Sequence, residues 1–587
     1  MTLADNSEFV ESELMQLSDM EVPPPTQADF AYIASRRVEV AITAGLNINN
    51  QLDAAEFMEC IGLKPLVAAL LGKVPLAANI DRTDAVECLS KLTMHDKSIA
   101  KDIAEIPRLV EVLCDLMEAP LLGFRQLQSR AEREKNIRAQ AQAISLMWRL
   151  VRSSDDAIES MRYSNRLRSI LNSIVRQPAA EVIDSMGTGA GKGFAGAVGT
   201  GNGTVRSTGV GKRAGAPEYN LQYSTKYKPK KPKNATTVAE YANLTPQQMA
   251  RVALAGLGGL PWVPKVPGQK GLRILTLDGG GTRGVLSIAY LKEILKRVNS
   301  DLEPYQMFDL ICGTSTGGII ACLLGAQRAS LASTEVLYDE FIEKVFGQRS
   351  NLRLVTDRAA YDEAVLEKIL YDMCGDQLMV DTQMHSCANV FCISSQVNAN
   401  PCKPNIWRNY NYPPGQKSRY PGSCRVNTFT AVRATSAAPT FFTPVPWENG
   451  LYVDGALVAN NPTAVATQEA KMLYPGVPIE MIVSIGTGYV NELKQIDTMG
   501  WDLLVNQLVA SSTGTEDTHA LLTDLLPKDM YFRFNPQLTV DYAIDEKDKG
   551  ILAGMKKIAR DDVASMETGP GRKEFELMIK MLKGSSR

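Results

Sequence analysis

The amino-acid sequence predicts an α/β protein in which a three-layer α/β/α domain follows an all-helical region. Three observations lead to this prediction. Beyond Gly271, short apolar segments alternate with longer helical ones, a pattern typical of a three-layer α/β domain. Between about residues 30 and 180, apolar residues recur at the spacing of a helix face. Residues 187–215, between the two regions, include eleven glycines and are expected to behave as flexible coil.

Length and composition exclude several classes of protein. With 587 residues the chain is expected to contain several compact units, because a domain typically has about 100–200 residues. The net charge of −2 provides no basic excess for phosphates, so no nucleic acid is expected as a partner. The ten cysteines include no C-x-x-C pair and show no metal-ligand spacing with the three histidines. We therefore expect no metal, no cofactor and no disulfide framework, and a reducing compartment.

Residues 1–29 are predicted to be a disordered acidic N-terminus. The first 25 residues carry six acidic side chains and no lysine or arginine, which argues against a secretory signal and an arginine-rich transit peptide. No apolar stretch approaches the roughly 20 residues needed to span a bilayer. The sequence therefore predicts a cytoplasmic protein that meets a membrane only peripherally.

Residues 30–180 are predicted to be helical, and they show a weak self-similarity. The apolar set Leu66, Val67 and Leu70 recurs 43 residues later, beginning at Leu109. A period near 40–47 residues is typical of armadillo and HEAT units, whose paired helices bury their apolar faces by stacking. This region is therefore predicted to be an armadillo-like repeat array and a candidate binding region for a protein partner. An irregular helical bundle is the alternative.

Residues 181–235 are predicted to be a linker, rich first in glycine and then in lysine. The lysines are interleaved with Pro229 and Pro232 in a short extended run. They are Lys226, Lys228, Lys230, Lys231 and Lys233. Such a run attracts anionic lipid headgroups by about 1 kcal/mol per basic residue near the membrane surface. Peripheral contact with a membrane is one interpretation, and a solvated tether is the other.

Residues 236–490 are predicted to hold the α/β domain, with candidate strands at 273–277, 308–312, 390–394 and 481–485. A glycine-rich motif joins the first strand to the helix that follows it. Its residues are Asp278, Gly279, Gly280, Gly281, Thr282, Arg283 and Gly284. Glycines at such a junction let backbone N–H groups converge on an anion, either a phosphate or a tetrahedral oxyanion. A P-loop or kinase would also need the motifs GK[ST] or HRD and DFG, which the sequence lacks.

A second motif, Gly-Thr-Ser-Thr-Gly, is centred on Ser315. It follows the second candidate strand and opens an apolar helix expected at 318–327. A nucleophile elbow requires this context: a sharp turn with the serine hydroxyl at its apex, flanked by small residues such as Gly313 and Gly317. Ser315 is therefore the candidate nucleophile.

A third motif, formed by Asp454, Gly455 and Ala456, follows the apolar stretch 451–453. Asp-Gly alone is most often turn chemistry, so its interpretation depends on the other two motifs. A serine hydroxyl needs a neighbouring base to take its proton, and histidine is the usual one.

None of the three histidines has the expected context for such a base. They are His95, His385 and His519. None lies in a strand-to-loop context after an acid, where the order Ser, Asp, His would place it. Asp454 is therefore the candidate base, with His385 or His519 as the alternative.

Together and in this order, the three motifs resemble the patatin-like phospholipase family, whose pattern is DGGGxRG, GxSxG and DGA or DGG. The resemblance covers about residues 271–490, and the stretches 407–410, 433–439 and 483–488 look like its calcium-independent phospholipase A2 gamma branch. It implies a patatin-like fold, a phospholipid substrate and a dyad of Ser315 and Asp454. It also implies an oxyanion hole at the backbone of Gly279, Gly280 and Gly281, with Arg283 at the family's arginine position. The helical region and the linker lie outside it.

The expected function is a phospholipase A-type serine acyl hydrolase that works without calcium. The alternative is a catalytically inactive lipid-binding module on a helical-repeat scaffold. Such a module would have no reason to retain Ser315, Asp454 and the glycine loop together. Residues 491–587, with a candidate strand at 531–534, are expected to be a C-terminal α/β extension of the catalytic domain.

Overall fold

The computed structural model describes residues 27–73, 80–123, 130–177, 244–347, 361, 363–490 and 514–584. Most of the predicted acidic N-terminus and the whole of the predicted linker at 181–235 lie outside the described residues. The helical region and the α/β region belong to one compact unit. Within the described part of the chain, no helix combines the length and the apolar character that crossing a membrane requires.

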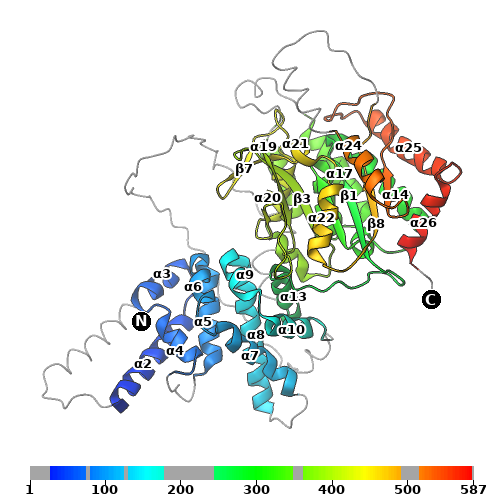
Figure 1. Ribbon diagram of the computed structural model, residues 1–587. Coiled ribbons are helices and arrows are strands. Elements are labelled where there is room, and N and C mark those ends of the chain that lie inside the picture. Colours follow the sequence, from blue (N-terminus) through cyan, green and yellow to red (C-terminus); the bar gives the residue numbers. More distant parts are fainter. Residues whose placement is uncertain are drawn as a thin grey trace. The chain divides into compact units, whose positions relative to one another are not determined.

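The α/β region is built on one nine-stranded sheet with the order β5-β4-β3-β2-β1-β8-β9, and β7, paired with β6, adds to β3 (Figure 1). The strands are β1 (Leu272–Leu277), β2 (Leu310–Thr314), β3 (Asn389–Gln396), β4 (Lys403–Arg408), β5 (Gly422–Ser423), β6 (Val445–Trp447), β7 (Gly450–Asp454), β8 (Ile479–Ile485) and β9 (Tyr531–Phe534). Strands β3, β2, β1, β8 and β9 are parallel to one another, whereas β4 and β7 run antiparallel to β3. The central strands therefore end at the same edge of the sheet.

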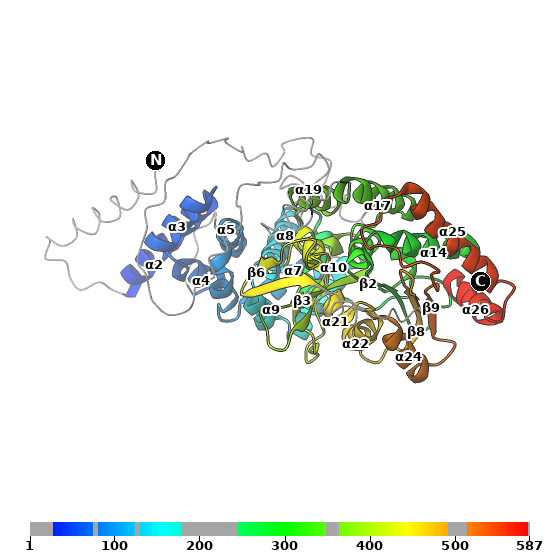
Figure 2. The same cartoon turned by 90° about the horizontal axis from the view of Figure 1, so that it is seen from above.

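Two apolar cores lie on opposite faces of this sheet, because successive side chains of a strand point to opposite faces. In β1, Leu275 and Leu277 belong to the larger core, and Leu272 and Ile274 belong to the smaller one. Seen from above, α14, α17 and α25 lie on one side of the strands, and α22 and α24 lie on the other (Figure 2). The sheet thus lies between two helical layers, which agrees with the predicted α/β/α architecture.

The helices of the α/β region connect and cover the strands. They are α14 (Gly284–Val298), α15 (Pro304–Met307), α16 (Thr316–Ala321), α17 (Leu331–Val345), α19 (Glu363–Cys374), α20 (Thr428–Thr435), α21 (Ala456–Ala459), α22 (Thr463–Leu473), α24 (Glu516–Leu525), α25 (Lys549–Met566) and α26 (Arg572–Lys583). A π-helical segment at Cys322–Ala326 continues α16. The helix predicted at 318–327 therefore begins two residues earlier, directly after Ser315.

The helical region has an apolar core of its own. Its helices are α2 (Gln27–Leu46), α3 (Gln51–Cys60), α4 (Lys64–Leu70), α5 (Arg82–His95), α6 (Ala100–Ala104), α7 (Leu109–Gly123), α8 (Arg130–Ser153), α9 (Asp155–Met161) and α10 (Asn165–Val175). Helix α8 packs against α5 and α7, and neighbouring helices bury each other's apolar faces. The armadillo-like interpretation stays a prediction.

The domain boundary expected at residue 236 assigns helix α13 (Pro246–Gly256) to the catalytic domain, but most of the helix contacts lie in the helical region. It packs against α8 and α10, and its Ala253 and Leu254 lie in the core of the helical region. Its Val252 instead shares a small core with Leu378 and Val380 of the α/β region. The chain therefore returns into the helical region after the linker before it enters the sheet.

A buried ion pair joins the two regions. Nε of Arg152, at the end of α8, donates to Oδ1 of Asp381 at 2.8 Å, and its Nη2 donates to Oδ2 at 2.9 Å. The side chain of Asp381 is 0% exposed. A bidentate pair fixes orientation as well as distance. Arg152 and Asp381 therefore form a direct contact between the two regions.

Candidate active site

Ser315 lies in the turn between β2 and α16 with a backbone conformation that is rare for a residue with a side chain. Its φ is 54° and its ψ is −125°. A Cβ on Gly313 would lie 2.1 Å from the backbone of Gly317, and one on Gly317 would lie 2.2 Å from the carbonyl oxygen of Leu277. Only glycine fits at these two positions, and the strained turn leaves Ser315 half-buried. The geometry is that of the predicted nucleophile elbow.

Asp454 reaches Ser315 because two strands meet end to end along one edge of β3. The last residue of β2, Thr314, pairs with Ile393. Antiparallel β7 occupies the next stretch of that edge, and its last residue, Asp454, pairs with Ser394. Ser315 Oγ donates to Oδ2 of Asp454 at 2.5 Å. The structure therefore brings the two predicted dyad residues into a direct hydrogen bond.

Backbone and hydroxyl groups hold the Asp454 carboxylate and the Ser315 turn. The amide of Ala456 donates to Asp454 Oδ1 at 2.8 Å, and a Cβ on Gly455 would lie 2.2 Å from Ile393 O. Thr435 Oγ1, at the end of α20, accepts from the Ser315 amide at 3.0 Å. These contacts explain the Asp-Gly-Ala pattern: glycine permits the close approach, and the third residue supplies a donor. The role of Thr435 was not predicted, although it lies in the stretch 433–439 noted from the sequence.

Burial sets the acid strength of Asp454, whose side chain is 3% exposed. Desolvation raises the pKa of its carboxyl group to about 7, against the hydrogen bonds from Ser315 and the Ala456 amide, which lower it. A base with a pKa near neutrality is suited to take a proton from a hydroxyl group and to return it.

This pKa predicts a pH profile. Below pH 7, kcat/KM for a soluble ester is expected to rise about tenfold per pH unit, because only ionised Asp454 accepts a proton and kcat/KM reports the free enzyme. Stability should change in the opposite direction. The folded pKa of about 7 lies above the unfolded value of 3.8, so the contribution of Asp454 to the free energy of unfolding is fully present below about pH 4 and is lost as pH rises to about 7. Thermal unfolding of Asp454→Asn should show higher stability than the wild type at pH 8. A half-maximal rate near pH 4 would contradict the assignment.

The glycine loop lies directly against Ser315. A Cβ on Gly279 would lie 3.0 Å from Ser315 Cβ, and Thr487 Oγ1 donates to the Gly279 carbonyl at 2.8 Å. The Gly279 amide donates to Asn460 O at 3.3 Å. Among the described residues, no acceptor takes the amide protons of Gly280 and Gly281. These two N–H groups therefore remain candidates to bind an anion at the glycine loop.

Arg283 lies on the far part of the same loop. Its Nε is within 3.5 Å of the Gly280 carbonyl. Burial lowers the pKa of its guanidinium, and the charge of Asp541 opposes that fall. The structure thus places Arg283 against the carbonyl side of the loop rather than at the serine hydroxyl.

Among the described residues, the side chains of Ser315 and Asp454 hydrogen-bond to each other and to the Ala456 amide, not to a histidine. His519, on α24, contacts the hydroxyls of Tyr531 and Thr523 through Nδ1, at 3.2 and 3.4 Å. His95 lies in α5 of the helical region. The Ser315 hydroxyl donates to a carboxylate instead. Within the described ranges, no group of three or more metal-ligating side chains is assembled.

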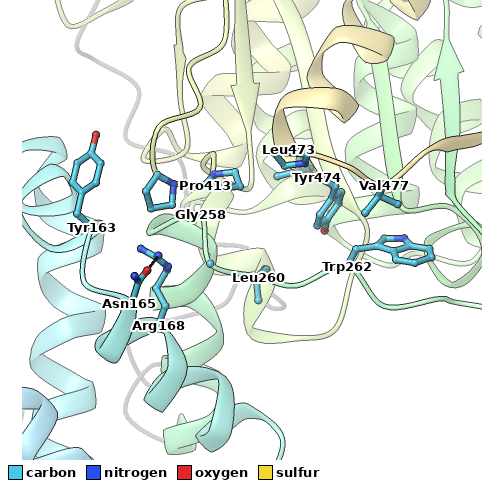
Figure 3. A pocket seen from close by; sticks show the side chains of 13 residues that line it. Tyr163, Asn165, Arg168, Gly258, Leu260, Trp262, Pro413, Leu473, Tyr474 and Val477 are labelled. Atoms are coloured by element: carbon cyan, nitrogen blue, oxygen red, sulfur yellow. Dashed lines mark hydrogen bonds between the residues drawn. The ribbon is translucent and has the colours of Figure 1, made fainter.

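A hollow of about 730 Å³ lies away from the dyad, between the helical region and the α/β region (Figure 3). Tyr163 and Arg168 line one end, and Trp262 and Tyr474 line the other, with Leu260 between them. Arg168 hydrogen-bonds to the side chain of Asn165 at 2.5 Å. This hollow does not include Ser315, so it is not the place where the dyad chemistry would occur.

Comparisons with known proteins identify a matching family model and several relatives. Residues 275–467 match the family model described as patatin-like phospholipase. The calcium-independent phospholipase A2-gamma of Mus musculus is 39% identical over 305 residues, which cover 50% of this chain and 39% of that protein. The Homo sapiens protein of the same name is 38% identical over 305 residues, with the same coverage of 50% and 39%. Phospholipase A I of Arabidopsis thaliana is 32% identical over 327 residues, covering 46% of this chain and 25% of that protein.

The chain thus spans about two fifths of the length of the first two of these relatives. Among solved structures, VipD from Legionella pneumophila aligns with a TM-score of 0.28 at 12% identity, over 50% of this chain and 66% of that chain. A likeness this weak carries no argument. The sequence relatives and the family match are the findings that bear on function.

Proposed function

We infer that this chain, whose residues 275–467 belong to the patatin-like phospholipase family, is a serine acyl hydrolase that cleaves fatty acyl esters of phospholipids. The observation that carries the proposal is the 2.5 Å hydrogen bond from Ser315 Oγ, at the apex of a strained turn, to the buried Asp454. A free serine hydroxyl is a weak nucleophile, and a base at this distance activates it. The names of the aligned relatives support a phospholipid as the substrate.

The proposed chemistry has two steps. Asp454 takes the hydroxyl proton while Ser315 Oγ bonds to the ester carbonyl carbon, and the Gly280 and Gly281 amides bind the developing oxyanion. Collapse of this intermediate breaks the bond to the alcohol, which leaves with the proton from Asp454. Water, deprotonated by Asp454, then attacks the acyl-enzyme. Collapse of the second intermediate breaks the bond between the acyl carbon and Ser315 Oγ, which takes the proton back from Asp454 as the fatty acid leaves. No step requires calcium, and the names of the gamma relatives describe them as calcium-independent.

Membrane contact and protein binding are further parts of the proposal. A phospholipid substrate requires the enzyme to meet a lipid surface, and the lysine-rich run at 226–233 provides local positive charge for it. That run lies outside the described residues, so its contribution rests on sequence alone. The helical region is proposed to bind a protein partner.

A fluorophosphonate probe tests the function directly, because it forms an adduct only with an activated serine. We expect labelling of the folded protein at Ser315, located by peptide mass spectrometry. Heat-denatured protein and Ser315→Ala are expected to show no adduct at this site. The competing function is an inactive lipid-binding module, suggested by the helical scaffold beside the α/β region. Folded protein that binds phospholipid vesicles but carries no adduct would establish the binder and exclude the hydrolase.

A further inference from the structure

The chain beyond residue 467, where the family match ends, contacts the residues next to the glycine loop. Strand β9 pairs in parallel with β8, with Arg533 opposite Ser484, and extends the sheet beyond residue 467 (Figure 2). The dyad chemistry uses no residue of this segment. Two of its groups nevertheless contact Asp278 and Thr282, the residues on either side of the three loop glycines.

The first contact is a buried ion pair between Arg533 and Asp278, which directly precedes Gly279. Arg533 Nη2 donates to Asp278 Oδ2 at 2.6 Å, and Arg533 Nη1 donates to Ser484 Oγ at 2.9 Å. The exposed fractions of the two side chains are 5% for Arg533 and 1% for Asp278. Burial raises the pKa of the Asp278 carboxyl, and the guanidinium opposes that rise. The guanidinium fork thus holds the residue at which β1 turns into the loop.

The second contact is made by the carbonyl of Ile544, which accepts from the Thr282 amide at 2.8 Å. A Cβ on Gly281 would lie 1.9 Å from the same oxygen, and Gly281 has a φ of 57°. The loop therefore fits beneath Ile544 only when position 281 is glycine. Asp278 and Thr282, on the two sides of the free amides, are both held by the C-terminal segment.

We propose that Arg533 is a positioning residue for oxyanion binding, which acts through Asp278 and with the Ile544 carbonyl as a second support. Desolvation opposes burying two charges, so a buried ion pair is weak evidence of added stability. Such a pair does impose a defined geometry, and here it does so at the residue next to the glycine loop. The inference rests on the proposed function, because it assigns the loop amides to an oxyanion.

The test compares Arg533→Met with the double variant Asp278→Asn/Arg533→Met. The single variant leaves the Asp278 carboxyl buried without its cation, so both Tm and kcat for a soluble ester should fall. The double variant removes both charges of the buried pair, and Glu516, which also lies 3.3 Å from Arg533 Nη2, is 37% exposed, so Tm should return toward the wild-type value. Its kcat should stay lowered by about 10- to 100-fold, because a small misplacement of catalytic groups has that effect. KM should change less than about twofold, as expected when an interaction is made only in the transition state.

Two further variants test the same proposal, one as an intermediate case and one as a control. Arg533→Lys keeps the charge but loses the fork, so its kcat should lie between those of the wild type and Arg533→Met. Tyr290→Phe is the matched control, because it removes a 2.7 Å hydrogen bond to Asp562 of α25 without touching the loop. It is expected to keep the wild-type kcat. Recovery of kcat together with Tm in the double variant would overturn the proposal. If the single variant fails to fold, the double variant and Arg533→Lys still decide.

Amide hydrogen exchange of a peptide spanning 279–283 provides a readout that needs no ester turnover. Exchange is expected to be faster in the double variant than in the wild type, and unchanged in Tyr290→Phe. Absence of a Ser315 adduct in the wild type would refute the hydrolase, yet it would leave this measurement intact. Unchanged exchange in the double variant would refute positioning by Arg533, whatever the activity.

Discussion

Ser315→Ala and Asp454→Asn are each expected to lower kcat for ester hydrolysis by a factor on the order of 10⁴, and the double variant should be no slower than the slower single one. Alanine removes the nucleophile. Asparagine keeps the shape of the carboxylate, but its amide cannot take the proton of a hydroxyl held at 2.5 Å. Because the two side chains act as one unit, their effects should not multiply. Steady-state kinetics on a soluble chromogenic ester, with circular dichroism as the check of folding, measures all three variants.

The histidines and a chelator provide the controls for this prediction. His385→Ala and His519→Ala should keep near-wild-type rates, since the hydrogen bond of the Ser315 hydroxyl goes to Asp454. EDTA should leave the rate of the wild type unchanged. A histidine variant as inactive as Ser315→Ala, combined with an active Asp454→Asn, would show that the base has been misassigned.

The parts of the site that sequence predicts are local. The elbow around Ser315 needs glycine at 313 and 317 because strand, turn and helix touch within five residues. The glycine loop likewise follows directly from β1. Four central strands, β1, β2, β3 and β8, are buried apolar runs that periodicity can find. Fold class and nucleophile therefore follow from short stretches of chain.

The meeting of Ser315 with Asp454 depends on strand lengths that a local pattern does not reveal. β3 has eight residues, and β2 pairs only with 389–393, so the edge at Ser394–Gln396 is left for β7 to occupy. The strands β4, β5, β6 and β7 were not predicted as strands, because they are short or partly exposed. No local sequence pattern connects Arg533 with Asp278, because 255 residues separate the two in sequence.

The helical region shows a similar limit of local reasoning. A glycine-rich composition predicts a flexible tether between the helical region and the α/β domain. Helix α13 follows that tether, yet it buries Ala253 and Leu254 in the core of the helical region. A chain that began at residue 236 would expose these side chains to water and would leave Asp381 without Arg152. We therefore expect such a truncated chain to be less stable than the full chain.

Gly281→Ala is expected to lower kcat about 100-fold, the effect of losing one oxyanion donor. Its Cβ would lie 1.9 Å from the Ile544 carbonyl oxygen, so the loop or the segment above it must move. Gly375→Ala is the matched control, because Gly375 has a φ of 70° and a Cβ there meets nothing within 4 Å.

Both alanines bear the strain of a left-handed backbone, roughly 1–2 kcal/mol, so the two proteins should lose similar amounts of thermal stability from this source. Any stability that Gly281→Ala loses beyond the control reports the clash with Ile544. The difference in kcat isolates the position of the amides, since Gly375 lies outside the site at the end of α19. The rate of fluorophosphonate labelling should fall in parallel with kcat in Gly281→Ala and stay unchanged in Gly375→Ala. Equal kcat in the two variants would mean that the glycine loop shapes the fold without binding the oxyanion.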